Sequence, residues 1–114
     1  MAGGDVRQIL AISNRTANGN SGIVQLGEKG ELLHLLVPVT AVGGAPSLTP
    51  SLLWSHDGVT GPINADPADT MTAITATPGA VKTFQVRAPW VQVNFLCSAG
   101  GVTFGLFYYV TGAP

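Results

Sequence analysis

The sequence predicts an all-β fold, either a two-sheet sandwich or a jelly-roll-like barrel of about eight short antiparallel strands. Short runs rich in β-branched and aromatic residues are separated by clusters of Gly, Pro, Asn and Asp, which is the pattern of strands joined by turns. Apolar and polar residues alternate in the clearest runs, as they do in half-buried strands. No run keeps a helical period beyond a turn or two, and short strands at this spacing are typical of sandwiches, jelly rolls and small barrels.

The length of 114 residues suits a single domain, with residues 1–5 as an N-terminal arm. Charged residues make up only 10% of the chain, whereas a typical soluble domain has about 25%. Two stretches, Leu32–His56 and Ala88–Pro114, contain no Asp, Glu, Lys or Arg. Pro, Gly and amide residues interrupt both too often for a membrane helix of about 20 residues. We therefore expect no membrane span, and a surface that other proteins largely cover.

The turn signals divide the chain into eight predicted strands. These are Val6–Ser13, Ile23–Leu26, Glu31–Val42, Leu48–His56, Met71–Ala76, Val81–Arg87, Val91–Cys97 and Val102–Val110. Gly27–Gly30 is expected to be a hairpin turn, and Gly100–Gly101 to join the last two strands in the clearest hairpin of the sequence. Pro38 predicts that its strand is an edge strand or contains a bulge, because proline cannot donate to a ladder.

The last predicted strand is apolar on both faces. Its inward series is Val102, Phe104, Leu106, Tyr108 and Val110. Phe107 and Tyr109 must then point the other way, and a strand that is apolar on both faces must be covered on both. In a two-layer domain the second cover comes from another chain, or else from a loop of the same chain.

The residues that could carry chemistry do not form a recognisable set. Two separated histidines, His34 and His56, and one cysteine, Cys97, are too few for a zinc site. Cys97 belongs to an inward-facing series, where a thiol is buried and inert. The loop Asn64–Asp69 could offer oxygen ligands to calcium, but it lacks the acidic spacing of a calcium loop and contains ordinary turn formers. We expect no enzyme, no metal and no cofactor.

Binding to nucleic acid is also not expected. The five basic residues stand singly along the chain, and nucleic-acid binding draws on clustered Lys and Arg. Trp54 and Trp90 could stack on sugar rings in a carbohydrate-binding module. Core packing is the expected place of Trp54, because it follows Leu52 and Leu53 in an apolar strand, and the place of Trp90 stays open.

Two short motifs resemble small all-β virion proteins of tailed bacteriophages. They are Trp54-Ser55-His56-Asp57-Gly58, which leaves a strand, and Phe84-Gln85-Val86-Arg87-Ala88-Pro89-Trp90-Val91, with the Gly-rich C-terminal segment following in the same order. The resemblance covers about residues 48–110. It implies a capsid decoration (cement) protein that sits on the outer surface of the head. Its implied partners are other copies of itself, as a trimer, and a major capsid or other virion protein.

The sequence therefore predicts a non-enzymatic virion structural protein, together with the residues that form its interface. The expected interface residues are Met1, Ala2, Gly3, Gly4, Trp90, Phe107 and Tyr109. The N-terminal residues are included because a Gly-rich end is poorly ordered unless another chain holds it. The alternative is a carbohydrate- or receptor-binding module, such as a fibre or tail tip domain. That module would need an exposed aromatic platform, whereas assembly needs a broad apolar patch.

Overall fold

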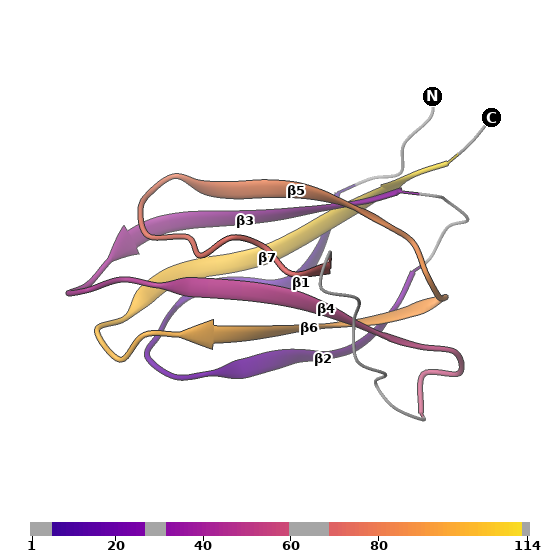
Figure 1. Ribbon diagram of the computed structural model, residues 1–114, viewed down its shortest axis with the longest axis horizontal. Coiled ribbons are helices and arrows are strands. Elements are labelled where there is room, and N and C mark those ends of the chain that lie inside the picture. The colour runs from indigo at the N-terminus through magenta and orange to yellow at the C-terminus, as the bar shows by residue number, and fades with distance from the viewer. Residues whose placement is uncertain (1–5, 27–31, 60–68, 113–114) are drawn as a thin grey trace.

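The computed structural model describes residues 6–26, 32–59 and 69–112, which form seven antiparallel strands in two facing sheets (Figure 1). The strands are β1 (Arg7–Arg15), β2 (Gly19–Gln25), β3 (Leu32–Val42), β4 (Leu48–Ser55), β5 (Gly79–Gln85), β6 (Trp90–Cys97) and β7 (Val102–Thr111). Sheet A has the order β1-β7-β3-β5 and sheet B the order β2-β6-β4. The predicted all-β, two-sheet sandwich is confirmed, with seven strands where about eight were expected.

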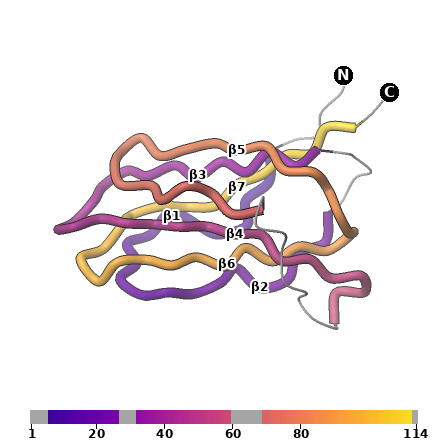
Figure 2. Tube along the Cα trace, in the orientation of Figure 1, coloured from indigo at the N-terminus to yellow at the C-terminus, as the bar shows by residue number. Residues whose placement is uncertain are grey.

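Successive strands alternate between the two sheets, so no strand is hydrogen-bonded to its neighbour in sequence. β1 pairs with β7, β2 with β6, β4 with β6, and β3 with both β5 and β7. In Figure 2 each strand lies in the other layer from the strand that precedes it in sequence. Together with the pairing of the first and last strands, this alternation gives the sandwich a jelly-roll-like connectivity.

The two hairpins predicted from the sequence are wrong. β6 and β7 lie in different sheets, so the turn at Gly100–Gly101 carries the chain across the sandwich instead of folding it back on itself. β2 and β3 are likewise in different sheets, and Gly27–Gly30 itself lies outside the described residues. The crossing puts Phe95 of β6 edge to face with Phe104 of β7 across the core, with 5.2 Å between ring centroids. Inward alternation is the same in a hairpin and in such an arch, so the pattern could not separate them.

The predicted strand Met71–Ala76 is not a strand but a segment held to β4 by two isolated bridges. Ser51 pairs with Thr70, and Leu48 exchanges both backbone hydrogen bonds with Ile74. The segment occupies the place of an eighth strand beyond β4, and Met71 and Ile74 are buried. Pro50 of β4 lies between the two bridges and has no N–H to donate, which prevents a continuous ladder there.

Pro38 lies in an interior strand, which corrects the expectation of an edge strand. β3 has β7 on one side and β5 on the other, and Pro38 forms the last pair of the β3–β5 ladder, with Gly79. The register between β3 and β7 shifts between Val39 and Ala41, immediately beyond it. The expected bulge is therefore present, and the missing N–H falls where one ladder ends.

The core lies between the sheets and is filled by alternate residues of the strands. β3 and β7 bury one side chain in every two, and the most deeply buried residues include Leu33, Leu35, Leu48, Leu52, Phe104 and Leu106. Trp54 and Cys97 belong to the same cluster, as the sequence predicted. Because this inward set is fixed, the identity of every outward-facing side chain is fixed with it.

The β3–β4 loop and the β6–β7 turn are in such close contact that a side chain at Gly43 does not fit between them. This contact gives a stability prediction. Gly43 donates its N–H to the carbonyl of Gly101 at 2.8 Å, and a Cβ on Gly43 would lie 1.9 Å from the carbonyl oxygen of Gly100. We expect Gly43→Ala to lower the free energy of unfolding by about 1–3 kcal/mol, as overpacking does. Gly44→Ala, with no atom within 4 Å of its Cβ, should stay within about 0.5 kcal/mol. Urea denaturation measures both, and equal losses would contradict the prediction.

Candidate functional site

The outward-facing side chains of sheet A form one continuous surface across its four strands. Cross-strand partners point to the same side, so the ladders define its members: Gln8, Ile12, Asn14, Leu32, His34, Leu36, Pro38, Ala41, Val81, Thr83, Gln85, Thr103, Phe107, Tyr109 and Thr111. We call this surface the outer face of sheet A. Phe107 and Tyr109 are half-buried and point away from the core, while their neighbours Leu106, Tyr108 and Val110 are buried. The predicted alternation of the last strand is thus confirmed.

The outer face of sheet A carries no acidic or basic side chain. None of the four strands contains Asp or Glu. Each of their three basic residues pairs with an inward-facing partner, namely Arg7 with Tyr108, Arg15 with Val102 and Lys82 with Leu35. Lys82, for example, reaches from the edge strand β5 to the carbonyl of Thr70 at 3.0 Å. The charges therefore lie at the edges of the sheet, and the face between them is left uncharged.

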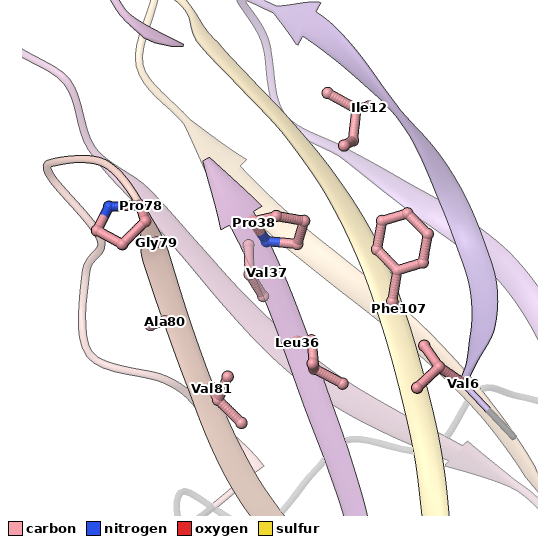
Figure 3. A pocket seen from close by; sticks show the side chains of 10 residues that line it. All are labelled: Val6, Ile12, Leu36, Val37, Pro38, Pro78, Gly79, Ala80, Val81 and Phe107. Atoms are coloured by element: carbon pink, nitrogen blue, oxygen red, sulfur yellow. The ribbon is translucent and has the colours of Figure 1, made fainter. Parts of the chain in front are cut away.

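An apolar groove of about 630 Å³ runs along this face (Figure 3). Leu36 and Pro38 of β3 line its middle, Val81 of β5 stands on one side, and Phe107 and Ile12 stand on the other. Gly105 leaves room for Phe107 and Ile12 on their side of the groove, because a Cβ at Gly105 would lie 2.8 Å from Ile12 and 2.9 Å from the ring of Phe107. The groove is open, and its lining offers aliphatic and aromatic carbon to whatever occupies it.

His34 and its neighbours form a polar cluster within the same face. The imidazole stacks on the Tyr109 ring, with 4.4 Å between centroids and 16° between planes. Its Nδ1 lies 2.8 Å from the Thr83 hydroxyl and its Nε2 lies 2.8 Å from the Thr111 hydroxyl. In either neutral tautomer one nitrogen donates to a hydroxyl and the other accepts from one. Both ring nitrogens are thus satisfied inside the face, without water or a partner.

The outer face of sheet B has a different character. It presents amide and hydroxyl side chains, including Thr49, Ser51, Gln92 and Asn94. The Gln92 amide donates to the Asn94 side chain at 2.6 Å. Leu53 and Leu96 are apolar exceptions on this face, and Leu96 has 61% of its surface accessible. The sandwich therefore has one apolar and one polar outer face, and the strands of sheet B contain no charged residue.

Trp54 is buried in the core and anchors a buried carboxylate. Its indole Nε1 donates to Asp69 Oδ2 at 2.9 Å. Arg87 donates to the same carboxylate from Nε at 2.6 Å and from Nη2 at 3.2 Å, a forked ion pair. Asp69 is only 1% exposed, so burial is compensated by these three donors. The calcium candidate at Asn64–Asp69 falls within the described residues only at Asp69, whose oxygens these side chains hold.

Trp90 is half-buried beneath the loop that follows β4. A Cβ on Gly58 would lie 2.7 Å from the Trp90 ring, so the Gly58 backbone rests directly on the indole. The φ angle of +77° at Gly58 also favours glycine. The two motifs that carry the phage resemblance are therefore in contact twice, through Asp69 and through Gly58. Neither tryptophan forms an open aromatic platform.

The predicted interface residues are not gathered in one place. Phe107 and Tyr109 share the outer face of sheet A, whereas Trp90 begins β6 in sheet B. Met1–Gly4 lie outside the described residues. His34, Leu36 and Val81 also belong to the outer face of sheet A and were not predicted from the sequence. Leu32–Val39 is apolar on both faces, as β7 is. This pattern could have predicted that His34 and Leu36 belong to the outer face of sheet A.

Metal-ligating residues do not cluster in the described part of the chain. No three His, Cys, Asp or Glu side chains there come together. His56 is exposed, and its Nε2 lies 3.6 Å from Asp57 Oδ2. Over residues 6–26, 32–59 and 69–112, no helix is long and apolar enough to cross a bilayer.

Comparison with protein families, curated proteins and solved structures finds no match to the chain. Its function must therefore be argued from the two outer faces and the contacts between the motifs. Of these features, the outer face of sheet A is the largest that the fold itself does not use.

Burial of Cys97 raises the pKa of its thiol, mainly through desolvation. The Sγ atom donates to the carbonyl of Arg15 at 3.2 Å, and the residue is 8% exposed. The neutral thiol is thereby the form that the native protein favours.

This shift predicts a pH dependence of stability. Above the ordinary Cys pKa of about 8.5, the unfolded chain loses the thiol proton while the native protein keeps it, so stability falls as pH rises through this window. The loss of unfolding free energy between about pH 7 and about pH 9.5 should be larger for the wild type than for Cys97→Ala. At neutral pH the substitution should cost about 1 kcal/mol. Identical pH profiles of the two proteins would contradict the expectation.

Proposed function

We propose that this chain is a non-enzymatic virion structural protein, and specifically a capsid decoration protein that stabilises the head of a tailed phage from its outer surface. Its proposed partners are other copies of itself and a major capsid or other virion protein. The observation that carries the proposal is the uncharged, apolar outer face of sheet A, with Phe107 and Tyr109 within it. The N-terminal residues Met1–Gly4 are proposed as a further contact.

An apolar face of this kind is unfavourable when it is exposed to water. Monomeric proteins rarely expose contiguous apolar patches larger than a few hundred Å², and larger patches mark interaction sites. Val6, Ile12 and Val81 are 58%, 46% and 62% exposed around a groove that is itself apolar. Aromatic residues are enriched and charged residues depleted at the centres of protein interfaces. The face has both properties, so docking onto another protein is its best-supported use.

The assignment to a virion is supported by the two short motifs and by their contacts. Trp54, Gly58, Arg87 and Trp90 all come from these motifs, and they meet around Asp69 and the Trp90 ring. Such packing favours a shared structural role for the motifs over a ligand-binding role. A carbohydrate-binding module would instead need exposed tryptophans, and Trp54 is 5% exposed.

The direct test uses particles of the phage that encodes the chain. Mass spectrometry of purified particles should find the protein in many copies per head. Particles that lack it should take it up from solution and then withstand heating better. If purified particles do not contain the protein, and particles that lack it do not bind it, the proposed function is wrong.

A double substitution tests whether the outer face of sheet A is the docking surface. Phe107→Ser with Tyr109→Ser should leave a folded sandwich, because both side chains point away from the core. Truncating one aromatic hot spot can cost 2 kcal/mol or more, so association through this face, with another copy or with a particle, should weaken at least about thirtyfold. The matched control is Leu53→Ser with Leu96→Ser on the outer face of sheet B, which should bind normally. Circular dichroism checks folding, and equal binding by both double variants would count against the face.

A further inference from the structure

We propose that the outer face of sheet A binds the same face of a second copy, so that the protein forms a twofold dimer with the two A sheets packed against each other. The inference rests on the proposed function in that it names the partner of the proposed docking face. It can nevertheless be tested separately, because a dimer in solution does not require a particle.

The outer face of sheet A is uncharged, so it suits a partner surface that is also uncharged. A charged residue buried against this face would lose its hydration and find no opposite charge there, which is costly. The same face of a second copy brings no such residue, because Arg7, Arg15 and Lys82 all pair with inward-facing partners. The outer face of sheet B is a poorer match, since its amides Gln92 and Asn94 lie in the middle strand β6 and would be buried against carbon. The amides of the outer face of sheet A, Gln8, Asn14 and Gln85, lie in its edge strands β1 and β5.

The interior strands of the face, β7 and β3, need no hydrogen bonds from a partner at their polar cluster. His34 already has both ring nitrogens bonded to Thr83 and Thr111, and its ring is stacked on Tyr109. Buried polar groups are destabilising only when they are left without a partner. The His34 cluster can therefore be covered by an apolar surface with little loss.

The outer face of sheet A is large enough to form a dimer interface. The strands of sheet A contain 9, 10, 11 and 7 residues. A residue in a sheet covers about 3.4 Å along the strand and about 4.8 Å across it, so the flat footprint is about 600 Å². Two such faces, covered in full, bury about 1,200 Å² in total. That value reaches the range of specific interfaces.

The shape of the outer face of sheet A also allows it to pack against a second copy of itself. The groove over Leu36 and Pro38 runs beside an exposed ridge that includes Val81. A twofold axis in the plane of the interface places the ridge of each copy in the groove of the other, which is the self-complementarity of an isologous contact. Two sheets packed in this way lie about 10 Å apart, with their strands within about 30° of each other. The phage resemblance implies three copies, whereas a self-complementary face favours two.

The test compares three lysine substitutions by sedimentation equilibrium of the full chain. Val81→Lys and Leu36→Lys place a charge on the ridge and in the groove. Leu96→Lys is the matched control, since Leu96 on the outer face of sheet B is 61% exposed and Val81 is 62% exposed. The wild type and Leu96→Lys should be dimers. Val81→Lys and Leu36→Lys should raise the dissociation constant at least tenfold, with circular dichroism unchanged for Val81→Lys.

Three outcomes separate this inference from the proposed function. A wild type that is monomeric at high concentration, yet binds particles and loses that binding with Val81→Lys, overturns the dimer and leaves the proposed function standing. A dimer that persists in both Val81→Lys and Leu36→Lys uses another surface, which also overturns the inference. A dimer that both substitutions dissociate supports it, even if the protein then proves absent from particles.

Discussion

The packing of sheet A against sheet B is the interaction on which the rest of the structure depends. No two consecutive strands are hydrogen-bonded to each other, so no local hairpin holds any part of the described chain by itself. Each strand is placed by the inward side chains that it shares with the other layer, such as Phe95 against Phe104. A shift of one residue in β7 would exchange Tyr108 for Tyr109 and turn the core outward. The core thus determines the outer face of sheet A as strictly as it determines the interior.

The distribution of charge follows from the same arrangement. In the described ranges the charged residues lie in edge strands or in connections, and the strands between them present neutral side chains. Arg87 and Asp69 form a largely buried ion pair that joins the segment after the β4 loop to the β5–β6 connection. Removing one partner of such a pair generally costs more than the pair contributes. This pair therefore holds connections together and leaves both broad faces without charge.

Much of the fold could be predicted from the sequence, because strand content depends on local pattern. The alternation in Val102–Val110 and the burial of Trp54 and Cys97 were read correctly. The pairing of strands could not be read, since the pattern of β6 and β7 is the same whether they form a hairpin or an arch. Two members of the outer face of sheet A, Phe107 and Tyr109, were predicted from the alternation of the last strand. Val81 was missed because it becomes part of the face only when β5 pairs with β3.

The pairing of β1 has a consequence for how the protein is made. Within the described part of the chain, β1 finds its only ladder partner in β7, which begins at Val102, and β7 also separates β1 from β3. On the ribosome, β1 must therefore wait for almost the whole of the described sequence before it can pair. Topologies that consist of such distant pairings fold in milliseconds to seconds, with apolar strands uncovered in the meantime. Synthesis of this chain is thus the period in which its apolar strands are most exposed to aggregation.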